Sequence, residues 1–160
     1  MTPDRIVARP GIVLLVGAVL VTAGTFLTWT RLPGAFPGDT SWFLHDTGID
    51  DFRGKGVFVL GIALIALGIL ALLDSPAVSI YRGPIGMAAC LAATNVILLL
   101  LWRAASLRST REPLQGSAIL EAVELHTGWG MAVSLVGAVA VLWGGYRTIR
   151  SSRISDPGEA

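Results

Sequence analysis

The sequence predicts an all-α membrane protein: a bundle of four transmembrane helices, with a short amphipathic helix outside the membrane between the third and fourth spans. Of its 160 residues, 53% are hydrophobic and only 14% are charged, whereas soluble domains carry charge on about a quarter of their residues. Four stretches of about 20 residues, long enough to cross the ~30 Å hydrocarbon core of a bilayer, contain no Asp, Glu, Lys or Arg. They lie between Arg9 and Arg31, Lys55 and Asp74, Arg82 and Arg103, and Glu124 and Arg147.

The predicted membrane domain covers residues 11–150. Its spans are expected at about 11–30, 56–73, 84–102 and 127–146. We expect residues 1–10 and 151–160 to be disordered, because chain ends are poorly ordered unless other contacts hold them.

The first span has an alternative interpretation as a cleaved secretory signal peptide. Arg5 and Arg9 precede the apolar run, and small residues follow it, as in such signals. The run continues to Trp29, however, which makes it longer than the apolar core of a signal peptide. A retained membrane helix is therefore the preferred interpretation.

Charge and cysteine content exclude several classes of function. The formal net charge of +1 is too small for a nucleic-acid-binding surface, which needs clustered Lys and Arg to neutralise phosphates. Cys90 is the only cysteine, so the chain has no CxxC redox pair and can form no internal disulfide. No acidic or basic side chain falls inside a predicted span, whereas proton-coupled transport requires one. The sequence thus predicts a protein that is not an enzyme and holds no cofactor.

Four spans place both termini on one side of the bilayer, and we expect a multi-pass plasma-membrane protein with cytoplasmic termini. Lys and Arg near the spans are equally numerous on the two sides, so the positive-inside rule does not decide the orientation. Cytoplasmic termini would place both long connections, 31–55 and 103–126, outside the cell; the second contains the predicted amphipathic helix at 112–125. Aromatic residues would then form an outer belt of Trp29, Trp102 and Trp129 and an inner belt of Tyr81, Trp143 and Tyr146.

Small residues recur at seven-residue intervals in every predicted span. Such a heptad forms a stripe along which the backbones of neighbouring helices approach closely, with left-handed crossings. Because burial of apolar surface does not drive association in lipid, this close contact is expected to stabilise helix packing. The predicted packing residues are Gly17, Gly24, Gly61, Gly68, Gly86, Ala93, Gly130, Gly137 and Gly144.

A polar layer is predicted at a common depth, where Thr22, Asn95 and Ser134 lie equally far along the chain from arginines at one membrane surface. An unpaired amide in hydrocarbon costs several kcal/mol, so Asn95 is expected to face the bundle interior. Its expected hydrogen-bond partners are Thr22, Ser134 or, failing those, Thr25. Asn95 lies about 180° around the helix from Gly86, so the small-residue stripes of the first and third spans should face outward. This arrangement predicts a homo-oligomer or a subunit of a larger membrane complex.

The connecting segments hold the candidate metal ligands, which are His45, Asp46, Asp50, Asp51 and His126. Histidine with carboxylate suits several metals, and residues 46–51 loosely resemble a calcium-binding loop, but without the EF-hand spacing or its closing glutamate. Loop carboxylates are more often solvated, or cap a helix as Asp50 or Asp51 could for the second span. We therefore expect no bound metal.

The layout of the chain resembles small four-span membrane proteins of actinobacteria, including the tryptophan-associated transmembrane protein family. The shared features are a first span that ends at a Trp ("TFLTWT"), a Gly-containing loop before an apolar second span, and a glycine-rich last span followed by Arg ("GWGMAVSLVGAVAVLWGGYRTIR"). The resemblance covers most of the chain. It implies a plasma-membrane location and supplies no catalytic residues.

The predicted function is that of a non-enzymatic integral membrane protein, an accessory or assembly subunit that packs against partners through its glycine-rich helix faces. The alternative is a small protein that binds or transports a lipid or another apolar molecule. A continuous cavity that reaches Asn95 would favour this alternative, and a dry, packed core would exclude it.

Overall fold

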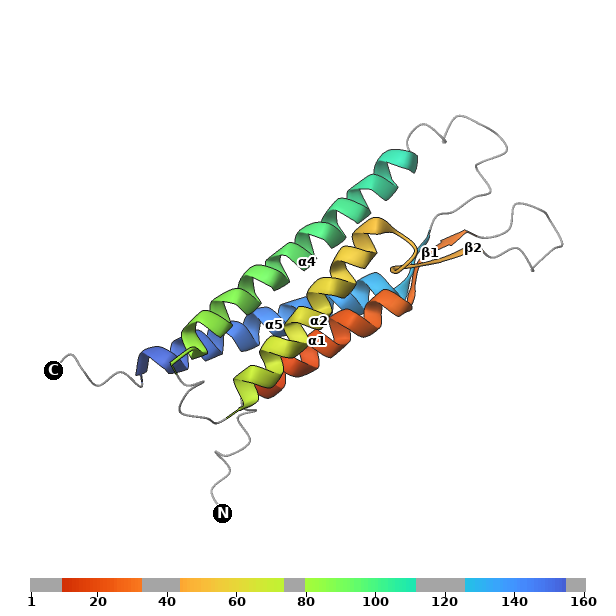
Figure 1. The fold of residues 1–160 in the computed structure, drawn as a ribbon. Helices are drawn as coiled ribbons and strands as arrows, with labels where there is room; N and C mark the ends of the chain where they lie inside the picture. Colours follow the sequence, from red (N-terminus) through yellow and green to blue (C-terminus); the bar gives the residue numbers. More distant parts are fainter. Residues whose placement is uncertain (1–9, 33–43, 74–79, 112–125, 155–160) are drawn as a thin grey trace, which may run out of the picture.

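The computed structural model describes residues 10–32, 44–73, 80–111 and 126–154, which form four helices and three short strands (Figure 1). The helices are α1 (Pro10–Phe26), α2 (Phe52–Leu72), α4 (Arg82–Arg111) and α5 (Trp129–Ile154). The strands are β1 (Thr28–Leu32), β2 (Leu44–Thr47) and β3 (His126–Thr127). The prediction of a helical bundle is confirmed.

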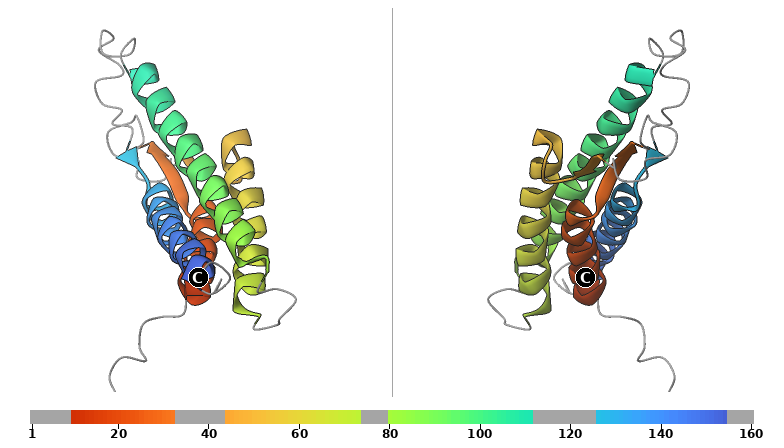
Figure 2. Two further views of the ribbon diagram at one scale, coloured as in Figure 1. Left: turned by 90° about the vertical axis from the view of Figure 1, so that its left-hand side faces the viewer. Right: turned by 90° about the vertical axis from the view of Figure 1, so that its right-hand side faces the viewer.

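The helices form an up-down-up-down bundle in which neighbours run antiparallel. α1 packs against α5 and α2, and α4 packs against the same two helices. α1 and α4 are therefore diagonally opposed, with α4 in front in one view of Figure 2 and α1 in front in the other. Of the four contacts, that between α1 and α5 is the most extensive and that between α2 and α4 the least. The start of α1 and the end of α5 lie at one end of the bundle, and the strands lie at the other (Figure 1).

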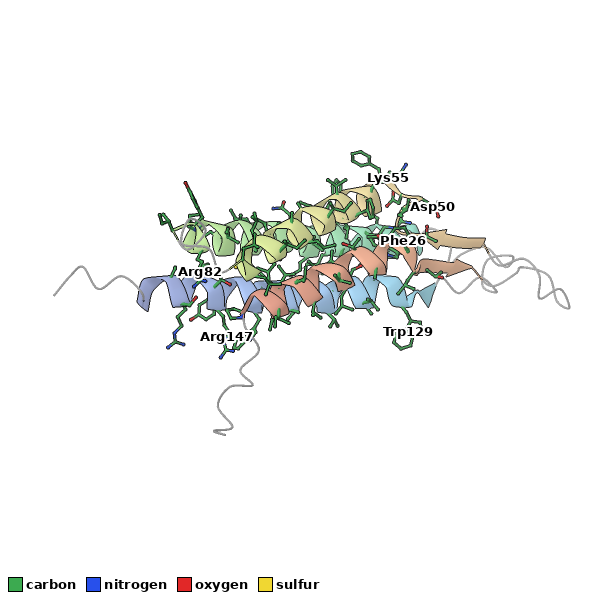
Figure 3. The ribbon with its side chains drawn as sticks, turned by 60° about the horizontal axis from the view of Figure 1, so that its bottom comes forward. Phe26, Asp50, Lys55, Arg82, Trp129 and Arg147 are labelled. Carbon is green, nitrogen blue, oxygen red and sulfur yellow. The ribbon has the colours of Figure 1, made fainter. Side chains whose placement is uncertain are left out.

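Three helices are long and apolar enough to cross a membrane: Phe52–Leu72 in α2, Arg82–Ser106 in α4 and Trp129–Ser152 in α5. α1 is also apolar but has only 17 residues, about 25 Å at 1.5 Å per residue. Large hydrophobic side chains are exposed along the outside of all four helices, far more than a soluble monomer presents to water. Charged side chains lie at the ends, Asp50 and Lys55 near the strands and Arg82 and Arg147 at the opposite end (Figure 3).

The helix ends differ from the predicted spans. α4 continues to Arg111 and α5 to Ile154, so residues 151–154 of the tail that was expected to be disordered are helical. A stretch without charges marks where the chain can lie in hydrocarbon, whereas a helix continues past the membrane surface until another interaction ends it. α1 instead ends early, at Phe26, because the β-branched and aromatic residues that follow favour the extended strand β1.

Two clusters of buried side chains fill the bundle along its length. The cluster nearer the chain ends contains Leu14, Ala18, Leu64, Ala89, Ala93 and Val141. The cluster nearer the strands contains Val21, Trp29, Val57, Val96, Leu100 and Ala138. Each cluster receives side chains from all four helices, so a single core runs from one end of the bundle to the other.

The three strands form a small antiparallel sheet in the order β2-β1-β3. Arg31 in the middle strand pairs with His45 on one side and His126 on the other. The sequence analysis predicts no strand in this region. Its amphipathic helix at 112–125, and the disorder expected for residues 1–9 and 155–160, lie outside the described residues.

Candidate interaction surfaces

The α1–α5 seam is a direct contact between two backbones. A Cβ atom at Gly17 would lie 2.7 Å from the carbonyl oxygen of Gly137, and one at Gly137 would lie 2.7 Å from the carbonyl oxygen of Gly17. Towards the strands, a Cβ at Gly24 would lie 2.8 Å from the oxygen of Gly130. At the other end, a Cβ at Gly144 would lie 2.8 Å from the backbone nitrogen of Leu14. The heptad glycines of the first and last spans therefore meet each other inside the bundle.

The remaining small residues also pack within the molecule. A Cβ at Gly86 in α4 would lie 2.8 Å from the oxygen of Gly145 in α5, and one at Gly68 in α2 would lie 3.0 Å from Cα of Leu15 in α1. Gly61 in α2 lies against the Thr22 side chain. Ala93 is fully buried in the core.

The prediction that the small-residue stripes of the first and third spans, Gly17, Gly24, Gly86 and Ala93, face outward is therefore wrong. All four are buried. Close backbone contact is a main source of helix association in lipid, and an outward stripe would forgo it within the bundle. These four small residues therefore pack against other helices of the same molecule and are not available to a partner.

The three residues of the predicted polar layer do not meet. Ser134 is buried, and its hydroxyl donates a hydrogen bond across the seam to the Val21 oxygen at 3.3 Å. The Thr22 hydroxyl donates to its own helix, to the Ala18 oxygen at 3.0 Å. Asn95 is exposed on the outside of α4.

The prediction that Asn95 faces inward and bonds to Thr22, Ser134 or Thr25 is thus wrong. Its Nδ2 donates instead to the oxygen of Leu91, one turn earlier, at 2.9 Å. A side chain that can bond to its own helix backbone reduces the penalty of facing outward.

Trp29 closes the strand end of the bundle. Its side chain is 1% exposed, and its Nε1 donates a hydrogen bond of 2.8 Å to the oxygen of Gly24 in the last turn of α1. Two glycines make room for the indole: a Cβ at Gly48 would lie 2.6 Å from its Cε2, and one at Gly130 would lie 2.5 Å from its Cδ1. Trp29 is therefore a core residue that joins α1, α5 and the turn after β2.

The predicted place of Trp29 in an interfacial belt is wrong for this reason. The other five aromatic residues of the two predicted belts are exposed, as side chains that contact headgroups must be. They are Trp102 and Trp129 towards the strands, and Tyr81, Trp143 and Tyr146 towards the chain ends.

Two polar contacts connect α2 to α4 at the strand end. Nη1 of Arg103 lies 3.3 Å from Oδ2 of Asp51, and the guanidinium carbon of Arg53 lies 4.7 Å from the centre of the Trp102 ring. Asp51 occupies the N-cap position of α2, but its side chain makes no capping hydrogen bond. These contacts join the least extensive of the four helix pairs at the strand end of the bundle.

Of the five candidate metal ligands, the structure describes the side chains of Asp50 and Asp51 and only the strand positions of His45, Asp46 and His126. The Asp51 carboxylate pairs with Arg103, and Asp46 lies opposite Thr30 in the sheet. His45 and His126 lie on strands to either side of Arg31. Within the described residues there is no group of three or more His, Cys, Asp or Glu side chains that could hold a metal ion.

Asp50 stabilises the turn between β2 and α2. One oxygen of its carboxylate accepts hydrogen bonds from the backbone N–H of Thr47 at 2.9 Å and from the Thr47 hydroxyl at 2.7 Å. These two donors, the hydroxyl first, hold the pKa of Asp50 below its ordinary value. A lowered pKa in the folded state means that the carboxylate stabilises this turn above its ordinary pKa and ceases to do so as the pH falls through the lowered one.

Replacement of Thr47 by valine should raise the pKa of Asp50 towards its ordinary value, because the hydroxyl makes the largest contribution to the shift. At neutral pH the turn should remain formed, since the backbone N–H still donates to the carboxylate. The measurement is an NMR titration of the Asp50 carboxyl carbon below pH 5 in detergent micelles. An unchanged titration curve would show that the hydroxyl does not bind the carboxylate.

Two apolar pockets open at the periphery of the bundle. One, of about 370 Å³, lies between α4 and α5 near the strands and is lined by Leu100, Leu101, Ala104, Trp129, Met131 and Leu135, among others. The other, of about 360 Å³, lies between α2 and α4 near the chain ends and is lined by Leu67, Leu70, Tyr81, Pro84, Ile85 and Ala88. Neither pocket includes Asn95, and the centre of the bundle between them is filled by the two core clusters.

The outer side of α4 is the surface that the sequence analysis does not single out. Thr94 and Asn95 are both exposed near the middle of this helix. Among the described residues, the exposed middle parts of α1, α2 and α5 are apolar throughout. The signal in the sequence is a repeat of alternating three- and four-residue steps that passes through Asn95 on the side of α4 opposite to Gly86.

No family model matches this chain, and no curated protein matches its sequence. The likeness to the tryptophan-associated transmembrane protein family therefore stays a prediction from layout.

Proposed function

We propose that this chain is a four-span integral protein of the plasma membrane, with cytoplasmic termini, and that it acts as a non-enzymatic accessory or assembly subunit. The three apolar helices that could cross a membrane support membrane insertion. α1 lies between α2 and α5 along the bundle, and a bilayer can thin locally to accommodate an apolar helix of about 25 Å. Outward-facing aromatic side chains near both ends of the bundle fit the two headgroup regions.

The observation that carries the proposed role is the separation of charge from the apolar part of the bundle. No acidic or basic residue occurs in 56–73, 83–102 or 129–146, and those labelled in Figure 3 lie at the two ends. Transporters and intramembrane enzymes place ionisable groups inside the bundle to bind or move charge. A bundle whose centre is filled by apolar side chains instead acts on other molecules through its surfaces.

The test is purification of the tagged full-length chain in a mild detergent, followed by mass spectrometry of the co-purifying proteins. We expect one membrane protein, or further copies of this chain, in fixed stoichiometry with the bait. A tagged, unrelated four-span protein expressed at the same level is the control. Release of the chain from membranes by alkaline carbonate, or solute uptake by liposomes that contain only this chain, would contradict the proposal.

The filled centre of the bundle argues against the alternative in which an apolar molecule passes through it. A narrower second candidate, binding of a lipid at the surface, is favoured by the apolar pocket between α4 and α5. Replacement of Ala104 by leucine would fill part of this pocket. The matched control is Ala66→Leu, on the exposed side of α2. If the pocket holds a specific lipid, native mass spectrometry should show that lipid retained by the wild type and the control but lost from the Ala104→Leu variant.

A further inference from the structure

The exposed side of α4 carries the heptad pattern of a coiled-coil seam. Residues spaced alternately by three and four places form two rows that face out of the bundle together. The row at the a positions is Ala88, Asn95 and Trp102, and the row at the d positions is Leu91, Leu98 and Ala105; all six are exposed. We call this set the α4 zipper face. The opposite side of α4 is buried against α2 and α5. On the α4 zipper face, Trp102 contacts Arg53 of α2 at one end, and no other described helix packs over the face.

Asn95 lies at the middle of the α4 zipper face. One of its amide N–H groups donates to the oxygen of Leu91. The second N–H and the carbonyl oxygen Oδ1 have no partner among the described residues. A polar group that faces hydrocarbon without a partner costs free energy. Asn95 exposes such a group in the middle of α4.

We propose that two copies of this chain pair through the α4 zipper face, with the Asn95 amides of the two copies hydrogen-bonded to each other. This inference rests on the proposed membrane insertion and not on the proposed accessory role. Copies that insert with the same topology are related by a two-fold axis along the bilayer normal, so α4 runs parallel to its mate. In a parallel pair each a residue lies opposite its own copy, which brings Asn95 against Asn95.

The chemistry of the amide selects a second copy as the occupant. A carboxamide carries both donors and an acceptor and is therefore complementary to an identical group. A single Asn at an a position, between leucines at d, is the arrangement that fixes the register of parallel two-stranded coiled coils. Leu91 and Leu98 supply those leucines on either side of Asn95, and Ala88 leaves room for the backbones to approach.

Disulfide crosslinking in native membranes tests which helix faces lie at the interface. In a Cys90→Ala background, which removes the only native cysteine, Leu98→Cys should form disulfide-linked dimers upon mild oxidation. Val136→Cys on the exposed side of α5 is the matched control. Because Gly86 packs against Gly145 and the two helices are antiparallel, Val136 lies at about the depth of Asn95. Equal crosslinking at the two positions, or none at Leu98→Cys, would overturn the proposal.

The amide itself is tested by measuring dimerisation of labelled copies by energy transfer at a series of protein-to-lipid ratios in liposomes. Loss of one interhelical hydrogen bond should weaken the dimer about 3- to 30-fold in the Asn95→Leu variant. Thr94→Val, which removes a neighbouring exposed polar group, should change the dissociation constant by less than about twofold. Asn95→Gln keeps the amide donor and acceptor and should bind more tightly than Asn95→Leu but less tightly than the wild type.

Two outcomes separate failure of this inference from failure of the proposed function. Unchanged dimerisation in Asn95→Leu, or equal weakening by Thr94→Val, would remove the amide from the interface. If the wild type stays monomeric in liposomes while Asn95→Leu loses a co-purifying membrane protein, the α4 zipper face binds another protein, which overturns the dimer but supports the accessory role.

Discussion

A valine at position 137 should force α1 and α5 apart and lower the free energy of unfolding by about 3 kcal/mol. The added Cβ would lie 2.7 Å from the oxygen of Gly17 and 2.7 Å from the nitrogen of Val21. Both are backbone atoms of a helix, which cannot rotate away as a side chain can. α1 could yield only by moving as a body, and that movement would open the contacts at Gly24 and Gly144 in the same seam.

The measurement is unfolding of the protein in detergent micelles by increasing fractions of dodecyl sulfate, followed by circular dichroism. Ala132→Val adds two methyl groups to the exposed side of the same helix and should change stability by no more than about 0.5 kcal/mol. The free energy of unfolding should fall less in the double variant Gly17→Val/Gly137→Val than the sum of the decreases in the two single variants, because the first substitution already separates the helices. Equal losses in Gly137→Val and Ala132→Val would show that the seam is not a close contact.

The approximate positions of the four apolar helices are predictable from the sequence, because a chain without charges for about 20 residues has few alternatives to a helix in lipid. The glycine heptads also identify residues at which helices touch. Which glycines contact each other is harder to predict, because Gly17 and Gly137 are far apart in the chain and the same spacing occurs in four segments. Only the fold shows that the first and last segments meet most closely.

The orientation of α1 and α4 is predicted wrongly because two penalties compete. If an amide exposed to lipid cost more than an exposed glycine stripe, Asn95 would turn inward, as the sequence predicts. In the structure Asn95 donates one hydrogen bond to its own helix, which reduces the first penalty. The backbone contact between Gly86 and Gly145 would be lost in the reverse orientation. The loss of this close helix packing therefore outweighs the remaining cost of exposing the amide.

The end of α1 depends on contacts that a local pattern does not contain. Trp29 lies in an apolar run, and the local pattern predicts that it belongs to the last turn of a helix. The two glycines that pack against its indole, Gly48 and Gly130, come from distant segments. The extended backbone of β1 turns the indole back over the end of α1, where its Nε1 donates to the carbonyl oxygen of Gly24, which also accepts a longer bond from the Leu27 N–H. The β-branched residues on either side of Trp29 are the one local signal for this strand.

Replacement of Trp29 by alanine should lower the free energy of unfolding by about 3 to 5 kcal/mol, the usual effect of truncating a large buried aromatic side chain. The substitution leaves a cavity between α1, α5 and the Gly48 turn. It also removes the closer of two donors to the Gly24 oxygen, which would keep only the backbone N–H of Leu27 at 3.3 Å. Trp29→Phe should lose less, about 1 to 3 kcal/mol, because it keeps part of the packing and loses the hydrogen bond.

Trp129→Ala is the matched control, since this indole lies at the same end of the bundle but is 74% exposed. Its removal should cost less than about 1 kcal/mol, because an exposed tryptophan leaves no cavity in the core. Hydrogen exchange adds a second measurement: in Trp29→Ala the amides of β1 and the last turn of α1 should exchange faster, while those of α2 near Leu64 should not. If Trp29→Ala and Trp129→Ala have equal effects, Trp29 lies in the headgroup region and not in the core, and the strands do not close the bundle.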